Sequence, residues 1–352
     1  MKPFSDLGAL LTLVAFAAAC AHSAAPAESS SPSLRPEPRA PLVEPPAPRP
    51  LTGENPFSGV KLYVDPDTSA AQGALRLRAS DPASAGILER IARQPQGVWI
   101  GDWNHDVFRA VDHLVRRAEA NRAVPVIIAY NLPYRDAAAA AEGVCHSCGG
   151  LSSEEAYRRW IRDFHAGIGG RRVVVVLEPD ALAGIDTLPA AARTERLFLV
   201  NDAIRVLRQN PVAAVYIDAG NPAWVPAEQM AELLKRAGIE HAHGFSLNVS
   251  NYETTEKCLE YGRKLSALTG GKHFVIDTSR NGAGPYLEAK NDYESWCNPP
   301  GRKLGTAPTS ETGDPLADAF LWLKHPGESD GECAGGPRAG AWWPEMALQL
   351  AR

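Results

Sequence analysis

The sequence predicts an α/β domain built as a parallel β/α barrel. Apolar strand-like segments alternate with amphipathic helical segments over roughly 300 residues, from about Asn55 to Arg352, as in parallel barrels. Val173–Leu177 is continuously apolar, as expected of a strand buried on both faces. Polar residues directly follow the strand-like segments. In parallel barrels the active site lies at these carboxyl ends of the strands.

A doubly wound open sheet is the alternative arrangement of the same elements. No Gly-x-Gly-x-x-Gly or Walker sequence follows an early strand, which argues against the nucleotide-binding form of that fold. The predicted strands, in chain order, are Lys61–Val64, Val98–Ile100, Val124–Tyr130, Val173–Glu178, Ala213–Asp218, Gly244–Val249, His273–Asp277 and Asp318–Lys324.

Helices are predicted between these strands. Ser152 and Glu155 have the spacing of a capping box, which indicates a helix start. Pro226 suits the first turn of another helix, and Gly238 suits its end. The other predicted helices are Asp106–Arg122, Glu195–Arg208 and Thr255–Leu268.

The N-terminal 54 residues differ from the domain in composition. Lys2 precedes the apolar run Leu7–Cys20, which is too short to span a bilayer and predicts a signal peptide over residues 1–20. The small residues before Cys20 resemble a bacterial lipoprotein signal, in which that cysteine is lipidated; an ordinary secretory signal is the alternative. Residues 21–54 are rich in Pro and predict a disordered linker. We therefore expect an exported protein, either secreted or lipid-anchored at the bacterial cell surface.

The overall composition excludes several other classes. The 352 residues carry a net charge of −5 and no dense cluster of Lys and Arg, so no nucleic-acid partner is expected. A hydrophobic content of 45% is ordinary for a soluble globular protein. We expect a monomer whose attachment to a membrane, if any, depends on a lipid at Cys20.

Carboxylates follow at least four of the predicted strands. A single Asp after a strand usually caps a helix or forms a turn, but capping alone does not explain six polar strand ends. Crowded carboxylates raise some pKa values and lower others, which separates the roles of acid and base. Trp residues lie near the same strand ends and suit the apolar faces of sugar rings, although core packing is the alternative for each. They are Trp99, Trp103, Trp224 and Trp296.

At these positions the sequence closely resembles glycoside hydrolase family 6, the cellulase family of endoglucanases and cellobiohydrolases. The resemblance covers residues 55–352 and implies a distorted parallel β/α barrel of about seven strands, with an active-site cleft at the carboxyl ends of the strands. The motifs that carry it begin at Tyr130 (YNLPYRD), Leu177 (LEPDAL), Tyr216 (YIDAG), Gly244 (GFSLNVSN), Asp277 (DTSRNG), Trp296 (WCNPPG) and Trp322 (WLKHPGESDG).

The resemblance also implies roles for three aspartates. Asp180 matches the general acid, Asp136 matches the carboxylate that tunes this acid, and Asp330 matches the proposed base for the attacking water. The family inverts configuration, so the acid and the base are expected roughly 6.5–9.5 Å apart. The implied substrate is a β-1,4-glucan, and no metal or organic cofactor is implied.

The sugar-binding positions follow from the same resemblance. Tyr130 matches the residue beneath the distorted sugar, and Asp218 matches a supporting carboxylate. The family usually has His at the position of Asn221, so the sugar contact expected there differs from the usual one, whereas no catalytic role is affected. The stacking positions are Trp99, Trp224 and Trp296, and the ligands for sugar hydroxyls are Asn248, Lys324 and Glu328.

Six cysteines suit an exported protein. Cys297 and Cys333 match a family disulfide, whereas the Cys that usually follows the Asp136 position is replaced by Ala137 and its partner is missing too. Cys145 and Cys148 are expected to form a local disulfide, with a metal pair as the alternative. Cys258 is expected to be a small buried residue.

The segments after Asp180 and before Asp330 are short. Since cellobiohydrolases of this family roof a tunnel with long loops, short segments predict an open cleft and endo action. The alternatives are an exo-acting cellobiohydrolase, a surface glucan-binding protein without catalysis, and a barrel enzyme for another exported β-glucan.

Overall fold

The computed structural model describes residues 42–46, 48 and 54–352. The predicted signal peptide, Cys20 and most of the predicted linker lie outside the described residues. Among the helices that are described, none combines the length and apolar character needed to cross a membrane.

Seven parallel strands form one sheet, with neighbours in chain order. The sheet curls until its edges meet, and the Gly97 N–H donates to the Trp322 carbonyl at 2.8 Å. The strands follow one another in chain order, without the reversal of a doubly wound open sheet, so the predicted barrel is confirmed. It is distorted, because within residues 54–352 no continuous ladder pairs the first strand with the last. The strands are β1 Val98–Ile100, β2 Val126–Ala129, β3 Val173–Leu177, β4 Ala213–Asp218, β5 Gly244–Leu247, β6 His273–Asp277 and β7 Ala317–Leu321.

The predicted strand at Lys61–Val64 is wrong. This segment makes one isolated bridge, between Leu62 and Val124, and joins no ladder. Pro66 follows two residues after the segment, and its missing N–H prevents a longer pairing.

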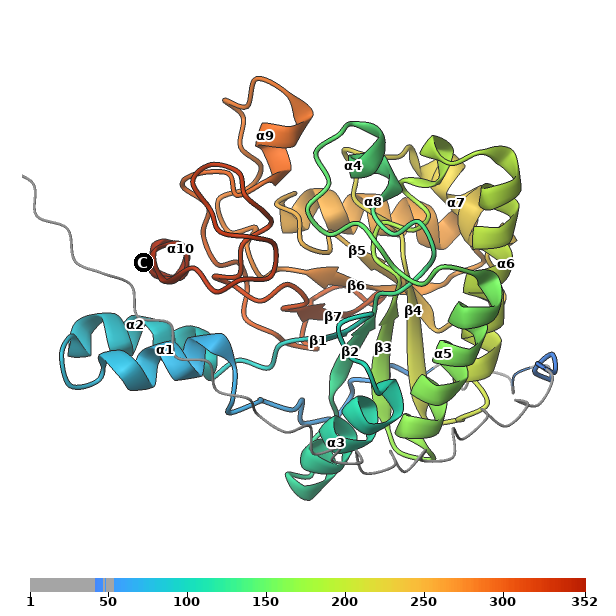
Figure 1. Ribbon diagram of the computed structural model, residues 1–352, viewed down its shortest axis with the longest axis horizontal. Coiled ribbons are helices and arrows are strands. Elements are labelled where there is room, and N and C mark those ends of the chain that lie inside the picture. The colour runs from blue at the N-terminus through green and yellow to red at the C-terminus, as the bar shows by residue number, and fades with distance from the viewer. Residues whose placement is uncertain (1–41, 47, 49–53) are drawn as a thin grey trace, which may run out of the picture. The chain divides into compact units, whose positions relative to one another are not determined.

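Helices cover the outside of the barrel, and Figure 1 shows α3, α5 and α6 side by side there. Most begin at a side-chain cap: Asp106 accepts from the Arg109 N–H at the start of α3. The cap of α5 is Ser153, one residue after the predicted Ser152, because Ser153 takes the extended conformation and accepts from the Ala156 N–H. The helices are α1 Ser69–Leu77, α2 Pro82–Ala92, α3 Val107–Ala120, α4 Ala137–Ala141, α5 Glu154–Ile168, α6 Ala190–Leu207, α7 Ala227–Arg236, α8 Thr255–Leu268, α9 Asp292–Trp296 and α10 Pro344–Ala351, with 3₁₀ turns η1 Ile185–Thr187 and η2 Ile239–His241.

The strand period of two divides the core into two layers. On β3, Val173 and Val175 pack with the helices, whereas Val174 and Val176 point into the barrel. Every residue of β3 is buried, as its continuous apolar sequence predicts. Because both faces are covered, the barrel is a rigid support for the loops that leave its carboxyl end.

A third apolar cluster joins α1, α2 and α10 beside β7. Trp322, directly after β7, packs there against residues such as Leu88 and Ala347. The polar residues that follow Trp322 are thereby anchored on one side by a packed aromatic ring.

Candidate active site

Three carboxylates gather at the carboxyl ends of β2, β3 and β4. The Asp218 carboxylate ends β4 and accepts from the backbone N–H of Asp180 at 2.9 Å, so it fixes the turn after β3. The same oxygen accepts from the Gly220 N–H at 3.1 Å, and the other accepts from the Ser246 hydroxyl. Both Asp180 and Asp136 have positive φ angles, 67° and 55°, which turns each side chain out of its strand direction.

Burial dominates the electrostatics of this cluster. Burial, together with the charges of Asp218 and Asp136, holds the pKa of Asp180 well above its ordinary value. Burial also raises the pKa of Asp218, to about 7, although its hydrogen bonds oppose the shift. The raised pKa of Asp180 favours its protonated form, which is the form that can donate a proton.

Asp136 lies beside this acid with both carboxylate oxygens engaged. One accepts from the Tyr130 hydroxyl and the other from the Ser147 hydroxyl. Although Asp136 occupies the N-cap position of α4, its side chain makes no capping hydrogen bond. Helix capping therefore does not account for this carboxylate.

Asp330 has the opposite electrostatic environment. The Arg280 Nη1 donates to both of its oxygens, at 2.9 and 2.8 Å, and the Lys324 Nζ lies 3.4 Å away. The Tyr252 hydroxyl and the Asn298 N–H also donate to it, at 3.1 Å each. Burial would raise the pKa of Asp330, but the charges of Arg280 and Lys324 outweigh burial and lower it. Asp330 is therefore ionised across the neutral range.

The pKa of Asp180 is thus raised and the pKa of Asp330 is lowered. This division suits a reaction in which one group protonates a leaving atom and another accepts a proton or stabilises positive charge. Comparison with known proteins agrees with this chemistry, since residues 57–352 match the model of glycosyl hydrolases family 6.

The chain belongs to glycosyl hydrolases family 6.

Individual relatives support this assignment. Endoglucanase A of Cellulomonas fimi is 41% identical over 300 residues, covering 84% of this chain but 62% of that protein, so this chain spans less than two thirds of the relative. The probable 1,4-beta-D-glucan cellobiohydrolase C of Aspergillus niger is 31% identical over 360 residues, covering 84% and 77%. The solved structure of the endoglucanase Cel6 from Mycobacterium tuberculosis, in complex with a methyl-cellobiosyl-thio-cellobioside, is 41% identical, with a TM-score of 0.78 over 84% of this chain and 98% of that one.

Several expected sugar-binding residues of this family 6 chain surround the carboxylates. The indole of Trp99 meets the Tyr130 ring edge-on at 5.2 Å and donates to the Leu323 carbonyl at 2.9 Å. Trp224 is 39% exposed in the loop after β4. Trp296 is half-buried at the end of α9, where it meets Tyr293 edge-on. These rings are fixed by their neighbours yet keep accessible surface.

Two polar residues also remain accessible. Lys324 directs its Nζ to the Ser329 carbonyl and to Asp330, and Glu328 pairs with His325 at 2.9 Å. Burial would raise the pKa of Glu328, but His325 and Lys324 lower it. Glu328 is therefore ionised across the neutral range.

Asn221 and Asn248 lie deeper than expected of sugar ligands. Asn248 is fully buried, and its amide bonds the backbone of Glu253 and Asp277. Asn221 is 5% exposed and accepts from the Ala223 N–H. Both amides organise their own loops, so we leave them out of the proposed sugar contacts.

Sequence reasoning missed the residues that hold the aspartates in place. Arg280 binds Asp330 and stacks over the Tyr252 ring at 4.4 Å. Glu178, buried before Asp180, accepts from the N–H groups of Asn131 and Leu132 and from the Tyr157 hydroxyl. For Glu178 the available signal was a charged residue directly after a continuously apolar strand.

The cysteines form two disulfides. Cys297 and Cys333 are joined, as the family resemblance implies, and Cys145 is joined to Cys148, so the local disulfide and not a metal pair is found there. Cys258 is a free, buried thiol, as expected. The first bridge ties the Trp296 loop to the Asp330 loop, and the Asn298 amide adds hydrogen bonds to the same loop.

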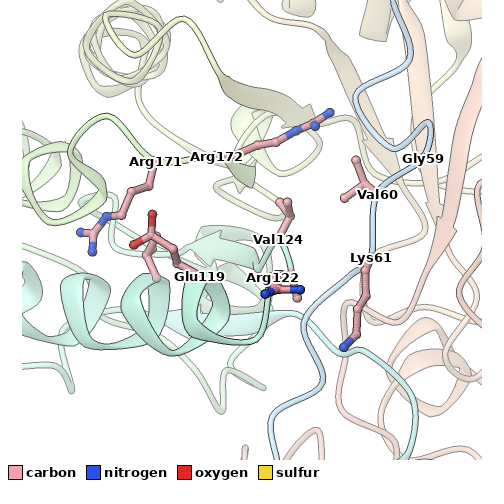
Figure 2. A pocket seen from close by; sticks show the side chains of 10 residues that line it. Gly59, Val60, Lys61, Glu119, Arg122, Val124, Arg171 and Arg172 are labelled. Atoms are coloured by element: carbon pink, nitrogen blue, oxygen red, sulfur yellow. The ribbon is translucent and has the colours of Figure 1, made fainter.

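A separate cavity of about 270 Å³ lies at the opposite end of the barrel. Figure 2 shows its lining from the Gly59–Lys61 segment, the end of α3 and the start of β3. The charged residues of this lining are Glu119 and the cations Lys61, Arg122, Arg171 and Arg172. One carboxylate among cations does not suit glycoside hydrolysis, so this cavity is not the candidate site.

Proposed function

We propose that this chain is an inverting endo-β-1,4-glucanase that hydrolyses internal bonds of cellulose-type glucans. The observation that carries the proposal is the pair of opposite pKa shifts at Asp180, after β3, and Asp330, after β7, both at the carboxyl end of a family 6 barrel. A glucan-binding protein without catalysis would need neither the raised pKa of Asp180 nor the lowered pKa of Asp330.

Asp180 acts as the general acid. Its raised pKa favours the protonated carboxyl, and the Asp218 contact to its backbone N–H fixes the turn from which it projects. The acid gives its proton to the glycosidic oxygen as the bond to the anomeric carbon breaks. Asp136, held by Tyr130 and Ser147, lies close enough to raise the pKa of Asp180 and to stabilise an oxocarbenium-like charge.

Asp330 is the proposed base. Both of its oxygens already accept hydrogen bonds from Arg280, and its lowered pKa weakens its affinity for a proton. We therefore infer that the attacking water loses its proton to Asp330 through a second water rather than by direct contact. The released product has the inverted anomeric configuration, because water attacks the face opposite the leaving oxygen.

The sugar contacts lie around these carboxylates. Trp99, Trp224 and Trp296 supply faces for pyranose rings, and Tyr130 lies beneath the cleaved residue. Lys324 and Glu328 bind hydroxyl groups as donor and acceptor. The expected substrate is thus a chain of glucose units that extends beyond the reacting bond in both directions.

Endo action is favoured over exo action by similarity. The endoglucanases from Cellulomonas fimi and Mycobacterium tuberculosis are 41% identical to this chain, against 31% for the Aspergillus niger cellobiohydrolase. The short segments around Asp180 and Asp330 support the same choice. Two disulfides also suit the proposed export of the chain.

The acid assignment can be tested with Asp180→Asn. The variant should lose hydrolysis of unactivated glucan but keep hydrolysis of an aryl cellotrioside with a good leaving group, because only the former needs a proton on the departing oxygen. Equal loss on both substrates would argue against Asp180 as the acid.

A further inference from the structure

Arg196 is a buried cation that the proposed mechanism does not use. It lies in the first half of α6, on the outside of the barrel (Figure 1), and only 4% of its surface is exposed. Burial lowers the pKa of its guanidinium, and the charges of Glu178 and Asp136 oppose that shift. Since a cation is rarely buried this deeply unless its donors are engaged, its hydrogen bonds indicate its role.

The donors of Arg196 reach the two loops that carry the candidate acid and its neighbouring carboxylate. Nη2 donates to the carbonyl oxygens of Pro133 at 2.8 Å and Tyr134 at 2.6 Å, in the loop after β2 that leads to Asp136. Nη1 donates at 3.3 Å to the carbonyl of Ala181, which directly follows the acid in the loop after β3. One planar guanidinium thus joins both loops, and its rigid fork fixes the geometry of the contacts.

Both loops hold residues other than glycine in the left-handed region of backbone conformation. The φ angle is 57° at Tyr134 and 55° at Asp136 in one loop, and 51° at Glu178 and 67° at Asp180 in the other. Side chains disfavour this conformation, so it persists only where the surrounding contacts enforce it. Arg196 binds the carbonyl of Tyr134 itself and, in the other loop, the residue that follows Asp180.

Two further contacts join the same loops. Glu178, after β3, accepts from the N–H groups of Asn131 and Leu132, after β2. A Cβ added to Gly184 would lie 3.2 Å from the Cβ of Ala138, so α4 packs closely on the loop after β3. The guanidinium from α6 differs from both contacts, because it comes from a helix outside the two loops. A substitution there leaves the sequence of both loops unchanged.

We propose that Arg196 is a positioning residue, which holds the loops of Asp136 and Asp180 at the spacing that proton transfer to the glycosidic oxygen requires. This inference rests on the proposed function. Without the fork of Arg196, the loop after β2 loses two carbonyl contacts and Asp136 shifts relative to Asp180. Because Arg196 is buried, it acts through the two loops and needs no contact with the glucan.

A shift of Asp136 also changes the proton affinity of the acid. Burial and the charge of Asp218 are the larger causes of the raised pKa of Asp180, and the charge of Asp136 adds to them. A wider separation from Asp136 therefore lowers this pKa. The charged or titratable groups that influence Arg196 or Asp180 come from several elements: Asp218 at the end of β4, Tyr130 and Asp136 after β2, Glu178 after β3, and Glu195 in α6.

The test compares wild type with Arg196→Lys and Arg196→Met. Lysine keeps the positive charge but lacks the fork, whereas methionine removes the charge as well. The matched control is Arg208→Lys, because Arg208 is also buried, stands at the C-cap of α6 and donates at 3.0 Å to the Ala213 carbonyl at the amino end of the barrel. The values of kcat and KM are measured across pH on cellohexaose, and at one pH on an aryl cellotrioside with a good leaving group. Circular dichroism confirms that each protein is folded at the assay temperature.

Both Arg196 variants should lower kcat on cellohexaose by about 10- to 100-fold, with KM within about twofold of wild type. In Arg196→Lys the alkaline limb of the kcat/KM–pH profile should move to lower pH. The aryl cellotrioside should lose less activity than cellohexaose, because its departing group needs no proton from Asp180. The control should lose stability but keep the kcat and the pH profile of wild type.

Two results would overturn the inference. If Arg196 acted through its charge alone, Arg196→Lys would match wild type while Arg196→Met lost activity. If its role were only structural, the variants would resemble the control, with a lower urea midpoint and an unmoved pH profile. Should Arg196→Met not fold, Arg196→Lys decides alone, because only a positioning role predicts a lower kcat in a folded variant that keeps the charge. Failure of the proposed function would look different, since wild type itself would then cut neither substrate.

Discussion

Replacing Arg280 with methionine tests how much the ion pair between Arg280 and the candidate base Asp330 contributes to the stability of the fold. Arg280 is fully buried and Asp330 is 6% exposed, and the Arg280 Nη1 reaches both carboxylate oxygens. Methionine fills much of the same volume but leaves Asp330 with Lys324 as its remaining cation at 3.4 Å. The variant therefore removes charge while keeping most of the packing against Tyr252.

The expected loss follows from the burial of the pair. Removing one partner of a buried ion pair costs about 3–5 kcal/mol, because the other charge stays buried and unpaired. Lys324 compensates in part, so we expect about 3 kcal/mol for Arg280→Met. The double variant Arg280→Met/Asp330→Asn removes both charges and should recover about 2 kcal/mol of this loss.

Urea unfolding of wild type, Arg280→Met, Asp330→Asn and the double variant at pH 7 measures this coupling. The pKa of Asp330 is lowered in the folded state, so its stabilisation is present above the unfolded pKa of about 3.9 and is lost as pH falls below it. The deficit of Arg280→Met should therefore shrink below about pH 4. A coupling energy near zero, or a deficit that does not change with pH, would refute the electrostatic explanation.

Three further predictions concern other parts of the site. Cys297→Ser with Cys333→Ser opens a loop of 36 residues in sequence separation and should lower the free energy of unfolding by about 4 kcal/mol in guanidinium titrations; a loss below about 1 kcal/mol would contradict it. Burial is the main cause of the raised pKa of Asp180, and the negative charge of Asp218 adds to it, so Asp218→Asn should move the alkaline limb of the kcat/KM–pH profile to lower pH. An unmoved limb would exclude this coupling. Glu178→Gln loses an acceptor for two backbone N–H groups and should lower the urea midpoint by the equivalent of about 1–3 kcal/mol, whereas an unchanged midpoint would show that the loop holds without it.

Much of the fold could be predicted because local sequence and burial agree. Val173–Leu177 is apolar throughout and becomes a strand that ends one residue before the predicted end at Glu178, and Thr255–Leu268 is a helix over the predicted residues. Lys61–Val64 was mispredicted because three apolar residues after a lysine do not show whether the segment has a pairing partner, and it makes only one bridge. Pairing is a long-range property that the local pattern does not contain.

The site was predictable where a motif fixes geometry over a few residues. The placement of carboxylates after strands follows from the parallel barrel, which brings distant strand ends to one rim. The partners of those carboxylates were not predictable in the same way. Arg280 lies 50 residues from Asp330, and His146 lies 147 residues from Tyr293, so each contact depends on how separate loops fold back over the barrel.

The central claim is that Asp180 is the acid of an endo-acting glucanase. The most direct measurement follows the viscosity of carboxymethyl-cellulose against the reducing ends released, with wild type beside Asp180→Asn. The account predicts a steep fall in viscosity for each new end in wild type and no fall in the variant. Reducing ends released with little loss of viscosity would contradict endo action, and an undiminished rate in Asp180→Asn would contradict the acid.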